Sequence, residues 1–305
     1  MMAGRSFLWY TMFPSIDKES GGNDMRTENF RRMLEARWSR DNFVCVGLDP
    51  EVARMPEPLW KGRGPNLQFN AFCMDIVGAT CDLVFAYLLN LAFFARHGEQ
   101  GMAVLRRIIA GIHRIAPDVP VILDAKFGDI GSTNLGYVDA TFSILDADAV
   151  TVSPYLGGES LKPFLAHADK GIIVLCRTSN PGAGEFQDLP VNTGIGVMPL
   201  YQYVAHRAAK AWNEKGNCCL VVGATYPHEL ADVRGIVGGM PILIPDIGAQ
   251  SGDVEKTVAA GKNSHGTGMI IGSSRGIIYA SDGADYPNAA RRETKRLRDQ
   301  INQYR

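Results

Sequence analysis

The sequence lacks several features that define whole classes of protein. No CxxC pair occurs among its six cysteines, most of which lie inside apolar runs. They are Cys45, Cys73, Cys81, Cys176, Cys218 and Cys219. A disulfide framework and a zinc-binding cysteine cluster are therefore not expected, and we predict buried free thiols in a reducing compartment, the cytoplasm. No membrane span is expected either, because no apolar stretch reaches the ~20 residues that such a helix requires.

Net charge is also nearly absent. The chain carries 31 basic and 32 acidic side chains, which gives a formal net charge of -1. This balance provides no general electrostatic attraction for nucleic acid or for anionic lipid, so we expect neither as a partner. Hydrophobic residues make up 46% of the chain and charged residues 21%. These values are close to those of soluble globular proteins and exclude disorder over the whole length.

Motifs of two common enzyme classes are missing. The six histidines show no HExxH or other metal-ligand spacing, and no nucleophile–histidine–acid order of a serine hydrolase is visible. These absences argue against a histidine-held metal and against a serine hydrolase triad. Residues 1–25 contain an aromatic cluster and a polar, Gly-rich stretch but no small-residue cleavage site, so we expect a poorly ordered extension rather than a secretory signal. The folded domain is then expected to cover residues 26–305.

The chain does contain a series of short, nearly continuous apolar runs rich in valine, isoleucine and leucine. Runs of this kind are typical of strands that are buried on both faces, as in parallel sheets. The eight runs are Phe43–Asp49, Leu83–Leu89, Pro120–Lys126, Ala149–Pro154, Gly171–Thr178, Cys218–Ala224, Pro241–Pro245 and Gly268–Ser274.

Helical patterns separate these runs. Amphipathic stretches include Gly101–Ile115 and Leu200–Glu214, and further helices are expected at Thr27–Arg37 and Ala289–Gln303. Eight strands that alternate with about eight helices predict an α/β protein with a single-domain (β/α)8 TIM barrel. A doubly wound open sheet is the alternative architecture.

The chemistry of such a barrel lies at the carboxyl ends of its strands and in the loops that follow them. Two long connections, Pro50–Gln68 and Asn180–Val197, could cover that end. In the string LDAKFGDIGST, Asp124 and Lys126 are two residues apart and should face the barrel mouth together. The carboxylate would keep the ammonium protonated, as a fixed proton donor. The alternative is a structural ion pair at the strand end, with Asp129 opening the next helix.

A second signal lies in the loops after the seventh and eighth runs, PDIGAQSGD and IGSSRG. Glycines beside polar residues let backbone N–H groups approach an anion, and Arg275 can bind a phosphate group with two parallel hydrogen bonds. These loops are also the recurrent phosphate position of (β/α)8 barrels. The pattern therefore favours a phosphate site.

Five strings resemble, in chain order, the motifs of the orotidine 5'-phosphate decarboxylase family, and its longer bacterial-type branch fits best. They are VGLDP, LDAKFGDIGST, TSNPGA, PDIGAQSGD and GSSRGIIYA. The resemblance runs from about Met25 to the C-terminus. The D-x-K-x-x-D string is shared in part with sugar-phosphate relatives, whereas the SNPGA, GAQ and SSRGI strings are more particular to the decarboxylases. The resemblance implies a homodimeric barrel that converts orotidine 5'-phosphate into uridine 5'-phosphate and CO₂ without metal or organic cofactor.

The resemblance also implies a role for each matching residue. Lys126 would protonate C6 of the pyrimidine as CO₂ departs, and Asp124 would lie against the substrate carboxylate. Asp129 and Thr133 would act across the dimer interface. The other implied substrate contacts are Asp49 for the ribose, Ser179 for the pyrimidine edge, Gln250 and Arg275 for the phosphate, and Asn90 at the end of the second run.

The chain departs from the family at the end of the second run. The family has a Lys-Pro-Asn string there, and this chain has Leu88, Leu89 and Asn90. With Leu88 in place of the lysine, Asp124 and Asp129 share one ammonium instead of two, which favours protonation of one carboxylate. We therefore expect reduced activity. There are three smaller departures from the family. Phe127 stands where an arginine is frequent, and Asp246 and Ser251 each stand where a glycine is usual.

Two other functions stay open. One is a catalytically impaired nucleotide-phosphate binder that keeps Gln250 and Arg275. The other is a metal-dependent sugar-phosphate lyase or synthase of the same suprafamily. Binding of uridine 5'-phosphate without turnover would select the binder, and inhibition by chelators would select the metal-dependent enzyme.

Overall fold

The structure is a computed structural model that describes residues 29–56, 59, 65–245, 247 and 253–305. Several residues named above lie outside this described part of the chain. They are the expected extension at residues 1–25, Asp246, Gln250 and Ser251.

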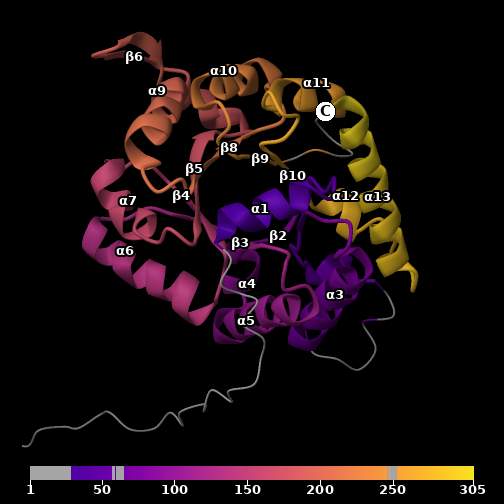
Figure 1. Cartoon of the computed structure of the whole chain (residues 1–305). Helices are drawn as coiled ribbons and strands as arrows, with labels where there is room; N and C mark the ends of the chain where they lie inside the picture. The colour runs from indigo at the N-terminus through magenta and orange to yellow at the C-terminus, as the bar shows by residue number, and fades with distance from the viewer. Residues whose placement is uncertain (1–28, 57–58, 60–64, 246, 248–252) are drawn as a thin grey trace, which may run out of the picture.

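Eight parallel strands close into a barrel in the order β1-β10-β9-β8-β5-β4-β3-β2 (Figure 1). They are β1 Val44–Gly47, β2 Ala86–Asn90, β3 Val121–Phe127, β4 Ala149–Val152, β5 Gly171–Arg177, β8 Cys218–Val222, β9 Ile242–Ile244 and β10 Met269–Ser273. Each strand overlaps one of the eight predicted runs. The (β/α)8 barrel is thereby confirmed, and the open-sheet alternative is wrong because β1 pairs with both β2 and β10.

Most of the helices form an outer ring around the strands, whereas α1 (Phe30–Trp38) lies across the middle of the barrel in the view of Figure 1. The other long helices are α3 Pro65–Thr80, α5 Gly98–Ile115, α6 Gly131–Val138, α7 Gly157–Leu165, α9 Leu200–Arg207, α10 Pro227–Val237, α11 Val254–Gly261 and α13 Tyr286–Tyr304. Shorter helical segments are η1 Val52–Arg54, α4 Leu91–Ala95, η2 Asp139–Ile144, η3 Pro181–Ala183, α8 Gly184–Gln187, η4 Ala208–Trp212 and α12 Arg275–Ile278. Helix α5 illustrates the predicted amphipathic pattern, since Val104, Ile108 and Ile112 are buried on one face.

Helix α1 lies at the amino-terminal end of the barrel. The Asn29 side chain accepts a hydrogen bond from the Arg32 N–H and caps the helix. Trp38 then donates its indole N–H to the Met269 carbonyl at the start of β10, and the Phe30 N–H reaches the Asp169 carbonyl before β5. These contacts leave the carboxyl ends of the strands at the other end of the barrel.

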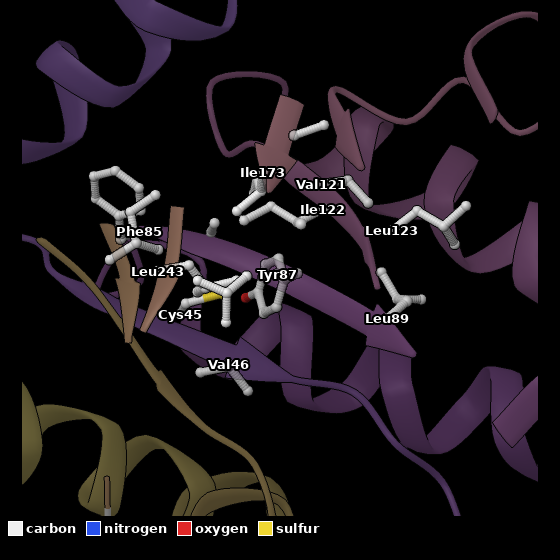
Figure 2. Packing of buried hydrophobic residues seen from close by; sticks show 14 of the residues in the cluster. Cys45, Val46, Phe85, Tyr87, Leu89, Val121, Ile122, Leu123, Ile173 and Leu243 are labelled. Carbon is white, nitrogen blue, oxygen red and sulfur yellow. The ribbon is translucent and has the colours of Figure 1, made fainter. Parts of the chain in front are cut away.

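The barrel interior is filled by side chains from different strands. Cys45, Ile122, Ile173 and Leu243 come from β1, β3, β5 and β9, and each is at most 3% exposed. Figure 2 shows these side chains gathered among the strands. Because parallel strands are covered on both faces, residues that point outward, such as Tyr87, are buried against the helices as well. The interior side chains form the floor beneath the carboxyl-terminal mouth.

The connection after β5 contains structure that the sequence analysis missed. We expected only a long loop over Asn180–Val197, but the segment holds a short helix, α8, and an antiparallel hairpin. The hairpin consists of β6 Pro190–Thr193 and β7 Gly196–Pro199, and it extends away from the barrel in Figure 1. Its strands are four residues long and contain no buried residue, so they lack the apolar runs by which buried strands are recognised.

All six cysteines lie in the described part of the chain and are free thiols, five of them buried. This agrees with the predicted absence of a disulfide framework. Within the described residues, no helix has the length and apolarity needed to cross a bilayer.

Candidate active site

A cavity of about 510 Å³ opens at the carboxyl ends of the strands. Polar and charged side chains of several strand ends line it, above an apolar floor that includes Cys45 and Leu243. The polar members are Asp49, Asn90, Asp124, Lys126, Thr151, Thr178, Ser179, Asn180, Gln187, Ser273 and Ser274. The cavity therefore has the position at which (β/α)8 barrels carry their chemistry.

Asp124 and Lys126 form an ion pair inside this cavity. The Lys126 Nζ atom lies 2.5 Å from Asp124 Oδ2, and the Asp124 side chain is only 12% exposed. Asn90 donates a second hydrogen bond to the same oxygen at 3.0 Å, and the Thr151 hydroxyl donates to Asp124 Oδ1 at 2.8 Å. These three contacts engage both oxygens of the carboxylate, which holds it in one orientation. The half-exposed ammonium is thus directed into the cavity by a fixed anion.

The backbone that carries Lys126 is irregular. Residues Leu123 and Phe127 of β3 pair with Val150 and Val152 of β4, so three β3 residues stand opposite one β4 residue. Lys126 itself has φ of +50°, in the left-handed region that side chains with a Cβ rarely occupy. A bulge and a positive φ at a charged residue are features that cluster at functional sites.

Asp49 lies two residues beyond the carboxyl end of β1. Its carboxylate accepts a hydrogen bond from the Ser274 hydroxyl at 2.9 Å and one from the Asn90 N–H at 3.3 Å. Burial raises the pKa of the Asp49 carboxyl to about 6; these two hydrogen bonds oppose that shift, and nearby Asp124 adds to it. Asp49 therefore titrates above an ordinary aspartate.

This pKa predicts a pH dependence of stability. Because the folded pKa of about 6 exceeds the ordinary aspartate pKa of 3.8, the native state binds more protons than the unfolded chain between those pH values. Stability should therefore fall as pH rises through this window. In urea titrations, we expect the Asp49→Asn variant to gain about 1 kcal/mol relative to the parent protein between about pH 5 and about pH 8. An equal difference at both pH values would contradict the raised pKa.

Leu88 lies where the family resemblance would place a lysine. Its half-buried side chain lines the cavity with Asn90, two residues further along β2, and its Cα pairs with Ile122 of β3. Among the described lining residues, Lys126 is the only lysine or arginine. The neutral amide of Asn90, rather than a second ammonium, is the other nitrogen donor to Asp124.

The structure brings together only some of the predicted site residues. Asp49, Asn90, Asp124, Lys126 and Ser179 all line the cavity. Three others, Asp129, Thr133 and Arg275, are not among the described lining residues, and Gln250 lies outside the described residues.

Asp129 and Thr133 are positioned just beyond the carboxyl end of β3. The Asp129 carboxylate accepts a hydrogen bond from the Ile130 N–H at 2.7 Å, and Thr133 is exposed on the first turn of α6. Neither belongs to the Asp124–Lys126 cluster of its own chain. Arg275 is exposed at the start of α12, directly after Ser274 of the cavity, and its guanidinium makes no ion pair within the described residues.

Two polar residues of the site were not singled out from the sequence. Thr151 lies in β4 and donates to Asp124, and Gln187 at the end of α8 accepts the Thr178 N–H at 2.8 Å. Thr151 carried a usable signal, because it is the one polar side chain in the strand AVTV, and a buried polar group must find a partner. The departure at Phe127 also has a structural explanation, since its ring stacks on Tyr137 of α6 with centroids 4.2 Å apart.

Within the described residues, no group of three or more histidine, cysteine, aspartate or glutamate side chains is arranged to hold a metal ion.

The fold and the site define a class: a single-domain (β/α)8 barrel enzyme whose charged cavity lies at the carboxyl ends of its strands.

Comparison with known proteins identifies the family. Residues 42–289 match the Orotidine 5'-phosphate decarboxylase / HUMPS family. The chain is 52% identical over 277 residues to an orotidine 5'-phosphate decarboxylase of Ralstonia pickettii, covering 90% of this chain and 99% of that protein. The chain belongs to the orotidine 5'-phosphate decarboxylase family.

Solved structures agree with this assignment. The Leishmania donovani OMP decarboxylase superposes with a TM-score of 0.75 and 36% identity, covering 89% of this chain and 99% of that one. The UMP synthase of the same organism gives a TM-score of 0.80 and 38% identity over 92% of this chain, which spans 57% of that longer protein.

Proposed function

We propose that this chain decarboxylates orotidine 5'-phosphate to uridine 5'-phosphate, the last step of de novo pyrimidine nucleotide synthesis, with Lys126 as the proton donor. The observation that carries the proposal is the Lys126 ammonium, held 2.5 Å from Asp124 at the cavity wall. The bond between C6 and the carboxylate carbon breaks, CO₂ leaves, and the electron pair stays on C6. The proton on Nζ then moves to C6, and the neutral amine regains a proton from solvent.

The electrostatics of the cavity support this reaction. A fixed cation stabilises the negative charge that develops at C6 and needs no reorganisation when the reaction occurs. The Asp124 carboxylate lies beside the proposed position of the substrate carboxylate, so their repulsion is relieved as CO₂ departs. Asp49 is suited to the ribose hydroxyls, and Ser179 to the pyrimidine edge. Gln250 and Arg275 would hold the phosphate.

Arg275 provides a test of the phosphate site. Charge-assisted hydrogen bonds contribute about 1.5–3 kcal/mol each, so Arg275→Ala should raise the KM for the nucleotide at least about tenfold. Affinity for the phosphate-free nucleoside should stay nearly unchanged. Binding of uridine 5'-phosphate and of uridine, measured by calorimetry, checks this directly, and an equal loss for both ligands would assign Arg275 a structural role.

A homodimer would complete the site. Asp129 and Thr133 lie outside the cavity of their own chain, next to apolar side chains that are unusually exposed. Ile130 and Leu135 are each 57% exposed on the same segment, and Tyr155 is 80% exposed. Exposed apolar side chains of this kind mark interaction surfaces, and a second copy of the chain would bury them. The two-fold arrangement would bring Asp129 and Thr133 to the partner's cavity.

Complementation tests the shared site. Lys126→Ala and Asp129→Ala are each expected to be inactive, but a heterodimer of the two contains one site with both residues intact. If subunits exchange randomly, an equal mixture should recover about one quarter of the parent activity, since half of the dimers are mixed and each has one working site. Activity measured before and after subunit exchange checks the expectation, and no recovery despite exchange would contradict a shared site.

One assay separates the proposed activity from its alternatives. Loss of ultraviolet absorbance from orotidine 5'-phosphate, with release of CO₂ in the presence of a chelator, would establish decarboxylation. Binding of uridine 5'-phosphate without turnover would select the impaired binder, and inhibition by the chelator would select a metal-dependent lyase or synthase.

The six free thiols support our placement of the protein in the cytoplasm, where thiols stay reduced.

A further inference from the structure

Thr151 occupies an unusual position next to the ion pair. Regular pairing of β3 with β4 stops at Leu123 and resumes at Phe127, so Thr151 alone stands opposite the three residues Asp124 to Lys126. Its side chain is 1% exposed, and it lines the cavity. On its other side, Thr151 keeps a regular register with Ile173 of β5. Thr151 thus lies on a strand that is regularly paired with β5, directly opposite the irregular segment of β3.

The single hydroxyl of Thr151 serves both members of the ion pair. It accepts the Lys126 backbone N–H at 2.9 Å and donates its hydrogen to Asp124 Oδ1 at 2.8 Å. The first bond satisfies an N–H group that the bulge removes from the regular ladder. The second turns Asp124 so that Oδ2 faces Lys126 Nζ and the Asn90 amide. The hydroxyl therefore connects the main chain of one partner to the carboxylate of the other.

We propose that Thr151 is a positioning residue that aims the Lys126 ammonium by holding both ends of the bulge. This inference rests on the proposed decarboxylation, in which the ammonium must lie close to C6. Thr151 acts through Asp124 and Lys126 and needs no contact with the reacting atoms. Without the hydroxyl, the carboxylate can rotate about its terminal bond, and the Lys126 N–H loses its partner.

Thr151→Val tests this role because valine keeps the shape and removes the hydroxyl. We expect kcat to fall by about tenfold to hundredfold, since small misplacements of reacting groups have effects of that size, with KM changed less than about threefold. Thr151→Ser, which restores the hydroxyl, should recover most of kcat. A matched control is Thr294→Val on α13, whose buried hydroxyl donates to the Ala290 carbonyl. Thr294 is not among the described residues that line the cavity, so the kcat of this variant should equal that of the parent.

A second readout does not depend on turnover. The rate at which an acylating reagent modifies Lys126 at fixed pH can be followed by mass spectrometry in the parent, in Thr151→Val and in Thr294→Val. If Thr151 holds the pair, labelling of Lys126 should accelerate at least about threefold only in Thr151→Val, because Asp124 no longer retains the ammonium.

The outcomes separate the two proposals. If the parent protein fails to turn over orotidine 5'-phosphate, the proposed function fails, and the labelling rates still decide whether Thr151 positions Lys126. Unchanged labelling in a folded Thr151→Val protein overturns the positioning role. So does a loss of kcat that Thr151→Ser does not recover.

Discussion

Replacing Lys126 with alanine is expected to lower turnover of orotidine 5'-phosphate by at least about a thousandfold, because proton transfer by a placed side chain contributes ~10²–10⁴. The variant also loses the cation that stabilises charge at C6, and it leaves Asp124 beside the substrate carboxylate without its ion-pair partner. Binding of uridine 5'-phosphate should persist, since the groups proposed to hold the ribose and phosphate are unchanged. Single-turnover kinetics and calorimetry measure the two quantities separately.

A matched control is available on the last helix. Lys295 forms an ion pair with Asp299 at the same 2.5 Å separation, but on the exposed surface of α13. Lys295→Ala should leave turnover unchanged, because exposed ion pairs contribute little and this one lies outside the cavity. Turnover in Lys126→Ala comparable to that of the control would mean that the proton comes from another group.

Replacing Leu88 with lysine is expected to raise turnover by at least about a hundredfold, which corresponds to ~2.7 kcal/mol of transition-state stabilisation. Leu88 lines the cavity together with Asp124 and Asn90, and a lysine there would direct a second ammonium toward the carboxylates. At an effective dielectric of about 20, two unit charges about 4 Å apart interact by roughly 4 kcal/mol. The half-buried position opens into the cavity, so the added charge stays in contact with solvent and with Asp124.

Leu88→Met distinguishes charge from shape at this position. Methionine is unbranched, as lysine is, but it carries no charge, so its turnover should stay at the parent level. Steady-state kinetics of the three proteins decide the question. Unchanged turnover in a correctly folded Leu88→Lys protein would show that the site is completed by groups other than a lysine at residue 88.

The elements of the barrel were predictable from local patterns. Strands such as β5 and β8 are nearly continuous apolar runs, because a strand covered on both faces is apolar on both. The β6–β7 hairpin was missed because none of its strand residues is buried, and strands that are not buried carry no such constraint. A strand can therefore be predicted from the sequence when it is buried, because burial requires an apolar run, whereas strand geometry alone requires none.

The polar groups of the site were predictable only in part. Alternation along a regular strand predicted that Asp124 and Lys126 share a face, and both do line the cavity. The chain reaches that arrangement through a bulge and a positive φ at Lys126, which no residue spacing indicates. The part played by Thr151 in this bulge depends on a neighbouring strand 25 residues away along the chain.

By itself, the sequence of this protein determined the number and order of the buried strands, the free state of its thiols and the residue types available at the strand ends. Each of these follows from local composition and period. Only the tertiary structure decided which side chains meet, because barrel closure brings Asp49 and Ser274 together across 225 residues. It likewise decided that burial raises the pKa of Asp49 and that Asp129 is not among the described residues that line the cavity. Hydrogen bonds and desolvation act over a few ångströms in space, whatever the separation along the chain, and only the closed barrel defines those distances.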